Sequence, residues 1–224
     1  MKESIGILAT KKLAHNQKQF LLNAGFKVID EDFIHIQPIA FEIKNTNDIL
    51  IFTSQNAVLN VLTYKDEFIH KPAICVGEKT ENILLENGFS VVCFQPEAAE
   101  LIRSIENEYM NKSFTFFCGT SKLNTIPDFL KEKSLKHEII EVYETIETPV
   151  KIAPKMDGIL FFSPSGVTSF IKENEITDEC CFCIGTTTAK AVEAYSKNIV
   201  IANQPTVENV IIQCIHYFKS TKND

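Results

Sequence analysis

Hydroxyl side chains stand directly after two apolar segments of this chain, where a strand would end and a helix begin. Residues 49–58 (ILIFTSQNAV) resemble residues 159–170 (ILFFSPSGVTSF). A second matched pair follows at similar spacing, residues 73–83 (AICVGEKTENI) and 181–192 (CFCIGTTTAKAV). An apolar strand, a small polar turn and a helix, repeated in this way, predict two similar α/β units. Small polar turns at strand ends are where such units bind ligands.

The hydroxyl groups at these turns are the first candidates for ligand binding. They belong to Thr53, Ser54, Ser163, Ser165, Thr186, Thr187 and Thr188. Each of them alone is more simply interpreted as a helix N-cap, for which Ser and Thr are preferred. Taken together, the two matched pairs favour binding, because all four turns could face one cleft.

Tyr143, in the segment IIEVYETIE, is a candidate for acid chemistry. A phenol keeps its proton at neutral pH and can donate that proton or a hydrogen bond. The simpler interpretation is an aromatic side chain on one face of a strand. The pattern by itself leaves both interpretations open.

Apolar runs of strand length alternate with helical segments along almost the whole chain. The apolar runs include IGILAT, ILIFTS, AICVG, SVVCF, FTFFCG, GILFFS, CCFCIG and NIVIAN. Several of the helical segments between them end at a glycine, such as Gly25 or Gly88, as helices commonly do. Uninterrupted apolar strands that alternate with helices predict an α/β fold with parallel sheets covered on both faces.

Two extended segments, residues 33–43 and 139–148, differ from these buried strands because charged or polar residues alternate along them. A break flanked by proline, TPVKIAPK, overlaps the end of the second segment. A pair of long strands crossing from one unit to the other would explain both segments. In that layout the N-terminal strands join the C-terminal third of the chain, although the sequence alone does not force it.

The composition argues against several classes of protein. The chain has 224 residues, a net charge of −7 and a single arginine, Arg103, so we do not expect it to bind nucleic acid. No apolar run reaches the roughly 18 residues of a membrane span. The N-terminus lacks the apolar core and cleavage site of a signal peptide. We therefore expect a cytoplasmic protein that does not associate with a membrane.

Motifs for several other chemistries do not occur in the sequence. There is no G-x-G-x-x-G, and GEKT at residues 77–80 lacks the earlier glycine of a P-loop, where Pro72 stands instead. This weakens a nucleotide-binding regulator as an interpretation. The five histidines lack metal-ligand spacing, and no G-x-S-x-G elbow is present. The seven cysteines lack paired C-x-x-C spacing and lie mostly in apolar runs, which predicts buried free thiols.

Seven short motifs, spread over nearly the whole chain, resemble the uroporphyrinogen-III synthase family. They are FTSQNAV (52–58), CVGEKT (75–80), FFCG (116–119), EVYET (141–145), FFSPSGV (161–167), IGTTTAKAV (184–192) and QPTVENV (204–210). Each motif is weak by itself. The order VYET, then FFSPSGV, then IGTTTA about twenty residues later is a more specific combination.

The resemblance implies two flavodoxin-like α/β domains with parallel sheets, joined by a two-stranded β-ladder, with the active site in the interdomain cleft. Domain I would comprise residues 1–35 and 149–224, domain II residues 40–142, and the linker strands residues 36–39 and 143–148. The implied enzyme is a cytoplasmic, monomeric lyase of tetrapyrrole (haem) biosynthesis. It converts the linear tetrapyrrole hydroxymethylbilane into uroporphyrinogen III, with loss of water and inversion of ring D, and uses no cofactor or metal.

The resemblance also implies roles for individual residues. Tyr143 matches the tyrosine of the family's V-Y-x-T motif and would assist departure of the substrate hydroxyl. The residues that would bind the substrate and its acetate and propionate groups are Lys11, Thr53, Ser54, Gly77, Gly119, Ser163, Ser165, Gly166, Thr186, Thr187 and Thr188.

The chain departs from the family's pattern at three positions. Only Lys122 is basic after the CG of the third motif, where relatives often carry arginine. Lys11 replaces a common arginine near the N-terminus, and Thr186 replaces a common proline. These changes bear on individual carboxylate contacts more than on the reaction.

A noncatalytic two-domain binding protein for an anionic small molecule or tetrapyrrole is the alternative from another class. Such a relative would retain the hydroxyl turns and lose the acid. The presence of Tyr143 therefore favours the enzyme.

Overall fold

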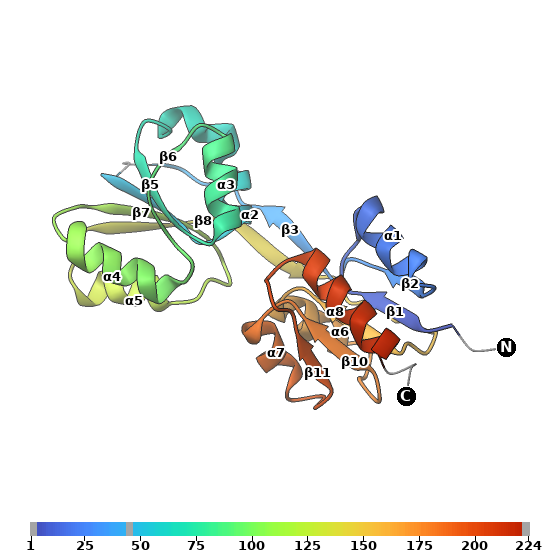
Figure 1. The fold of residues 1–224 in the computed structure, drawn as a ribbon. Coiled ribbons are helices and arrows are strands. Elements are labelled where there is room, and N and C mark those ends of the chain that lie inside the picture. The colour runs from blue at the N-terminus through green and yellow to red at the C-terminus, as the bar shows by residue number, and fades with distance from the viewer. Residues whose placement is uncertain (1–3, 44–46, 221–224) are drawn as a thin grey trace. The chain divides into compact units, whose positions relative to one another are not determined.

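The chain forms two compact units in a computed structural model that describes residues 4–43 and 47–220 (Figure 1). The first unit consists of the described residues up to His35 and from Ile146 onward, and the second unit is Ile36–Thr145. The chain therefore leaves the first unit once and returns to it once. Both ends of the sequence contribute to the first unit.

The first unit contains a sheet of parallel strands. Its elements are β1 (Gly6–Ala9), α1 (His15–Asn23), β2 (Lys27–Asp30), β9 (Gly158–Phe161), α6 (Pro164–Ile171), β10 (Cys180–Cys183), α7 (Thr186–Val192), β11 (Ile199–Ile201) and α8 (Val207–Ser220). The strand order is β11-β10-β9-β1-β2, and every neighbouring pair is parallel. The N-terminal strands β1 and β2 thus share a sheet with strands from the last third of the chain.

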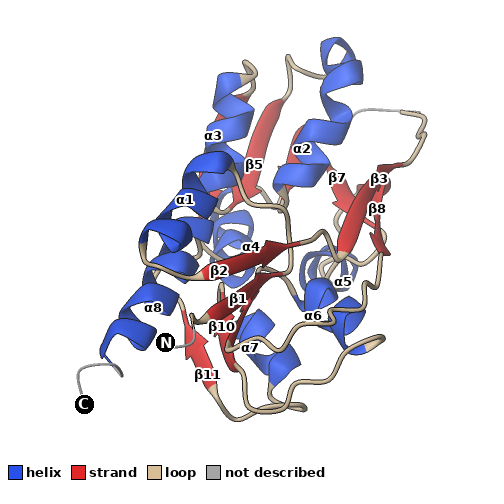
Figure 2. Ribbon diagram, turned by 90° about the vertical axis from the view of Figure 1, so that its right-hand side faces the viewer, coloured by secondary structure: helices blue, strands red, loops and turns tan. Residues whose placement is uncertain are grey.

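Both faces of this sheet are covered by helices. Ile159 and Phe161 of β9 pack with residues of α6 and α7, whereas Leu160 between them packs with residues of α1 and α8. This alternation follows from the period of two along a strand. Helices α1 and α8 pack against each other on their face (Figure 2). Because each face is buried, the strand consists of consecutive apolar residues.

The second unit contains a six-stranded sheet. Its elements are β3 (Ile34–Pro38), β4 (Ile49–Phe52), α2 (Gln55–Val61), the 3₁₀ segment η1 (Leu62–Glu67), β5 (Pro72–Val76), α3 (Glu78–Glu86), β6 (Ser90–Gln95), α4 (Ala98–Glu108), β7 (Phe114–Gly119), α5 (Thr125–Glu132) and β8 (His137–Glu147). The strand order is β3-β8-β7-β4-β5-β6, and the strands from β8 to β6 are parallel to their neighbours.

Strand β3 pairs with β8 in the opposite sense. The amide of Ile39 donates to the carbonyl of Val142 at 3.1 Å, and the amide of Thr148 donates to the carbonyl of Phe33 at 2.9 Å. The residue number rises on one strand as it falls on the other, so this pair is antiparallel. The two segments that the sequence singled out as long extended strands are therefore paired, and they are the two connections between the units (Figure 1).

Aromatic residues dominate one face of the second sheet. Phe52 and Phe117 stack with ring centroids 5.3 Å apart, and Phe68 lies 5.2 Å from Phe117. Residues of α2 and α3 complete this core, and residues of α4 and α5 form the core on the other face. The predicted α/β class with parallel sheets is confirmed in both units.

The cysteines are free thiols, as predicted. Six of the seven are buried, and Cys93 is half-buried. Burial raises the pKa of Cys75 to about 12 and that of Cys118 to about 11, so these thiols stay protonated and are poor nucleophiles at neutral pH. Among the helices of the described residues, none is long and apolar enough to cross a membrane.

Candidate functional site

Each unit has one point at which the order of its parallel strands reverses. Numbered in chain order, the strands of the first sheet read 2-1-3-4-5, the flavodoxin-like order, and the reversal lies between β1 and β9. The parallel strands of the second sheet read 3-2-1-4-5, and the reversal lies between β4 and β7. Ligands of open α/β sheets bind outside the carboxyl ends of the strands at such a switch point.

Ser54 and Tyr143 meet at the switch point of the second unit. Ser54 follows β4, and Tyr143 lies on β8 beside Gly119, the last residue of β7. The hydroxyl oxygen of Tyr143 is 3.0 Å from Ser54 Oγ, a hydrogen bond in which either group could be the donor. The ring of Tyr143 is half-buried against the aromatic core. The phenol is thus held at the carboxyl edge of the sheet, where a ligand is expected.

The ring of Tyr143 lies directly over Gly119. A Cβ atom at position 119 would be 2.6 Å from Tyr143 Cζ and 2.9 Å from its hydroxyl oxygen, closer than real Cβ atoms approach other atoms. Only glycine fits at this position while the ring stays in place. The family resemblance implied that Gly119 binds substrate, and the structure places it in contact with the candidate acid.

The serines at the two matched turns are helix N-caps. Ser54 Oγ accepts the amide of Asn56 at 3.2 Å, and Ser163 Oγ accepts the amide of Gly166 at 3.0 Å. The simpler interpretation of these two hydroxyls therefore holds. Capping does not use up a hydroxyl, however, because one donor proton and a second lone pair remain for other partners.

Two candidate residues of the second unit, Gly77 and Lys122, already have hydrogen-bond partners within that unit. Gly77 has a φ of +87°, which favours glycine, and its amide donates to the carbonyl of Gln95 at 2.9 Å. Lys122 forms an ion pair with Glu141, with 2.7 Å between Nζ and Oε1, and this hydrogen bond raises the pKa of the Lys122 ammonium. A ligand carboxylate would have to compete with Glu141 for Lys122.

The switch point of the first unit gathers hydroxyl and amide groups. Thr10 follows β1, is buried, and donates from its hydroxyl to the carbonyl of Leu160 on β9 at 2.9 Å. Ser163 and Ser165 follow β9, and their hydroxyl oxygens are 3.1 Å apart. Lys11 extends the same edge as an exposed cation. This arrangement has the groups to bind an anion, with polar donors beside one positive charge.

A network of charges fixes the turn that carries Lys11. Asp30, at the end of β2, forms an ion pair with Lys18 and accepts the amide of Leu13 at 3.1 Å. Burial opposes the ionisation of Asp30, but these hydrogen bonds outweigh it and lower the pKa of the carboxyl group. Lys12 donates to Glu31 and to the carbonyl of Asp30. No motif in the sequence signals this network, because it joins residues that are distant along the chain.

The three threonines after β10 are not equivalent. They are the first residues of α7, and Gly185 precedes them as the N-cap. Thr186 and Thr187 are exposed, whereas Thr188 is 2% exposed and faces the interior of the unit. Thr186 and Thr187 are therefore available to a ligand, and the side chain of Thr188 contributes to packing. Thr53, at the other unit's switch point, is half-buried.

The two switch points define an α/β protein whose candidate groups are hydroxyls, backbone amides, one phenol and one exposed lysine. Within residues 4–43 and 47–220, no three His, Cys, Asp or Glu side chains are grouped to hold a metal ion. The family model for uroporphyrinogen-III synthase HemD matches residues 17–212, most of the chain. The chain belongs to the uroporphyrinogen-III synthase family.

Solved structures of this family have the same fold. The uroporphyrinogen-III synthetase of Helicobacter pylori matches with a TM-score of 0.73 at 19% sequence identity, over 95% of this chain and 99% of that chain. A mutant uroporphyrinogen III synthase of the extremely thermophilic bacterium Thermus thermophilus matches with a TM-score of 0.72 at 10% identity, over 99% of this chain and 100% of that one. A comparison with curated proteins finds no match.

Proposed function

We propose that this protein is a uroporphyrinogen-III synthase, a lyase that closes hydroxymethylbilane into uroporphyrinogen III with loss of water and inversion of ring D. Its membership of the family supports this proposal. The observation that carries it is the phenol of Tyr143, held at the switch point of the second unit by a 3.0 Å contact with Ser54. A protein that only bound tetrapyrroles would not need an acid at that point.

Tyr143 would act as the general acid. A pyrrole nitrogen of the substrate donates its electron pair into the ring, and the bond between the terminal carbon and the hydroxyl breaks. The departing oxygen keeps that bond's electrons and takes the proton of Tyr143, so water leaves and an electrophilic azafulvene remains. A positioned acid contributes about 10²–10⁴-fold to a rate.

The hydroxyl and amide groups of the first unit would hold the substrate's acetate and propionate groups. Ser163, Ser165, Thr187 and the exposed Lys11 supply polar or charged donors at the carboxyl edge of that sheet. The harder task of the reaction is positional, because ring D must attack through its substituted carbon, and spontaneous closure gives the type I isomer. Orientation of this kind is a large source of rate and selectivity.

The proposal includes the finer expectations that follow from the family resemblance. The protein would act as a monomer, without a cofactor, in tetrapyrrole (haem) biosynthesis. Its seven free cysteines suit a reducing compartment such as the cytoplasm.

An isomer assay tests the proposed function. Hydroxymethylbilane is generated in situ, the protein is added, and the products are oxidised and separated as type I and type III porphyrins. A matched reaction with heat-denatured protein measures spontaneous closure. Mainly type III product is the expected result. Type I product alone, formed at the spontaneous rate, would reject the enzyme and leave the noncatalytic tetrapyrrole-binding protein, which a titration with the product would then test.

A further inference from the structure

The pairing of β7 with β8 contains an extra residue next to Tyr143. Cys118 pairs with Glu141, whereas the next residue of β7, Gly119, pairs with Tyr143. Val142 therefore has no residue opposite it, and β8 carries a bulge at this position. Bulges bend a strand and redirect the side chains that follow, and they occur often beside active sites.

The bulge changes the direction of Tyr143. Neighbouring residues of a regular strand point to opposite faces of a sheet. Here Val142 belongs to the aromatic core that contains Phe52 and Phe117, and Tyr143 packs against the same core. If β8 were regular through Val142, with no bulge, Tyr143 would share the face of Glu141, whose partner is Lys122. The bulge turns Tyr143 instead to the side on which its phenol reaches Ser54.

Gly119 provides the space for the redirected ring. Its backbone does not require glycine, because the glycines with positive φ among the described residues are Gly25, Gly77 and Gly88. The requirement is steric, since Cζ, Cε2 and the hydroxyl oxygen of Tyr143 all lie within 2.6–2.9 Å of the place where a Cβ would stand. A larger residue at position 119 would displace the outer end of the ring and leave the backbone as it is.

Ser54 has one donor proton and two lone pairs, and one lone pair accepts the amide of Asn56. Its proton is therefore free to be donated to the oxygen of Tyr143. In that arrangement the phenol's own proton points away from Ser54 and is available to a ligand. The reverse arrangement would commit the phenol's proton to Ser54.

We propose that the β8 bulge and Gly119 position Tyr143 so that its hydroxyl oxygen accepts a hydrogen bond from Ser54. In this proposal Gly119 does not bind substrate. This inference rests on the proposed function of Tyr143. When the phenol gives its proton to the departing hydroxyl, the negative charge left on its oxygen faces the Ser54 proton. A hydrogen bond to a charged oxygen is roughly twice as strong as a neutral one. The proton that the substrate loses after ring closure restores the phenol, so the cycle balances.

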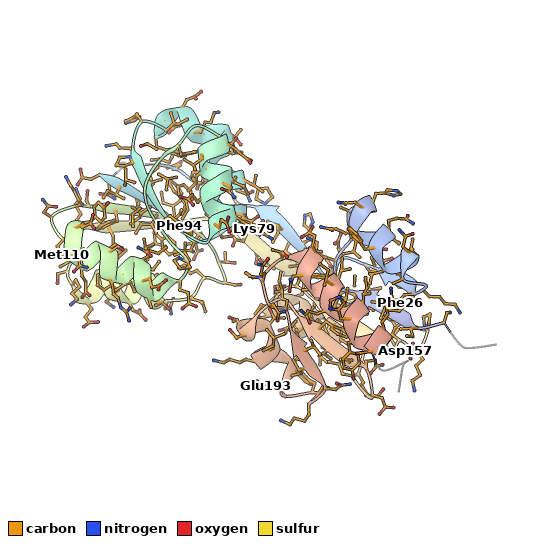
Figure 3. All side chains as sticks on the ribbon, in the orientation of Figure 1. Phe26, Lys79, Phe94, Met110, Asp157 and Glu193 are labelled. Atoms are coloured by element: carbon orange, nitrogen blue, oxygen red, sulfur yellow. The ribbon has the colours of Figure 1, made fainter. Side chains whose placement is uncertain are left out.

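The variant Gly119→Ala tests the positioning role. A displacement of about 1 Å in a reacting group costs about 10²-fold in rate, so we expect kcat to fall by about that factor while KM changes by less than about twofold. Gly6→Ala is the matched control. Gly6 also lies in a strand, but at the amino end of β1 beside Asp157 (labelled in Figure 3), and its nearest Cβ neighbour would be an ordinary 3.4 Å away. We expect wild-type kinetics from Gly6→Ala.

A double-mutant cycle with Tyr143→Phe separates positioning from substrate contact. If Gly119 acts through Tyr143, Gly119→Ala will add little to the loss already caused by Tyr143→Phe. An additive loss, or a loss seen mainly in KM, would overturn the inference and make Gly119 a substrate contact. Ser54→Ala should show the same lack of additivity, and it provides a second variant if Gly119→Ala does not fold.

Crystal structures of the wild type and of Gly119→Ala test the geometry without substrate. We expect an unchanged β7–β8 backbone, a displaced Tyr143 ring and a broken Ser54–Tyr143 hydrogen bond in the variant. A ring that stays in place with the bond intact would overturn the inference. If the wild type proves to have no synthase activity, the proposed function fails, and these structures still decide whether Gly119 positions Tyr143.

Discussion

The switch points of the two units have the same turn but place it beside different partners. In both, an apolar strand of similar sequence ends at a serine that caps the following helix, Ser54 in the second unit and Ser163 in the first. The hydroxyl of Ser54 contacts the phenol of Tyr143, whereas that of Ser163 contacts the hydroxyl of Ser165. A repeated scaffold therefore presents a phenol in one copy, and hydroxyls and amides beside the exposed Lys11 in the other.

The neighbouring strand explains this difference. Across the switch point, the neighbour of β4 is β7, which ends at Gly119 and leaves room for a ring. The corresponding neighbour of β9 is β1, which is followed by Thr10. The Thr10 hydroxyl donates a hydrogen bond to the carbonyl of Leu160. This difference supports the proposed roles, with proton transfer at the second unit and binding of the substrate's anionic groups at the first.

Removing the phenol should have the largest effect on activity. We expect Tyr143→Phe to fold normally and to lose about 10²–10⁴-fold in kcat, the contribution of one general acid. Steady-state formation of type III product measures this loss. Tyr195→Phe, an exposed tyrosine of the first unit, is the control and should match the wild type. Wild-type turnover in Tyr143→Phe would mean that Tyr143 is not the general acid.

Asp30→Asn should have the next largest effect, on the stability of the turn that carries Lys11. The variant loses hydrogen bonds to a charged carboxylate, so we expect unfolding to become easier by about 1.5–3 kcal/mol at neutral pH. The lowered pKa of Asp30 sets the sign of the pH dependence. Its contribution is complete above the unfolded-state value of 3.8 and disappears as the pH falls through the folded-state pKa.

Urea unfolding of Asp30→Asn and the wild type at a series of pH values measures this difference. The control is Asp178→Asn, which removes an exposed pair with Lys155 and should change the free energy of unfolding very little. A difference between Asp30→Asn and the wild type that grows as the solution becomes more acidic would contradict the assignment.

Ser163→Ala should weaken substrate binding with little change in kcat. A lost neutral hydrogen bond is worth about 0.5–1.5 kcal/mol, so KM should rise by about two- to tenfold. The loss of a helix cap also lowers stability, which unfolding experiments measure separately. Ser196→Ala is the control, because Ser196 accepts the amide of Asn198 at the amino end of β11, away from the site. An unchanged KM would mean that Ser163 acts only as a helix cap.

The smallest effects on KM should come from substitutions of two lysines, Lys11 and Lys122, which should differ from each other. Lys11 is exposed and free to meet a substrate carboxylate. An exposed ion pair contributes about 0.2–1 kcal/mol, so Lys11→Gln should raise KM by about 1.4- to fivefold. Lys122 is 18% exposed in its side chain and is paired with Glu141, so Lys122→Gln should change KM less. A larger rise in KM for Lys122→Gln would mean that the substrate displaces Glu141, and that the second unit also binds carboxylates.

Much of this arrangement could be predicted because its signals are local. The apolar runs predict the strands, and serine after a strand predicts a helix cap, which Ser54 and Ser163 both form. The contact between Ser54 and Tyr143 joins residues 89 positions apart, so it depends on the strand order and register. The motif EVYET gives no sign of the bulge at Val142. Simple alternation along this motif would place Tyr143 on the face of the sheet opposite to Val142, away from Ser54.

The division of roles between the switch points is tested most directly by single-turnover kinetics with protein in excess of hydroxymethylbilane, because chemistry and binding then appear as separate parameters. Tyr143→Phe should lower the maximal rate of type III formation and leave the half-saturating protein concentration unchanged. Ser163→Ala should raise the half-saturating concentration and leave the maximal rate unchanged. If both variants change the same parameter, or if Tyr143→Phe keeps the wild-type rate, the assignment of the acid to the second unit and of binding to the first is wrong.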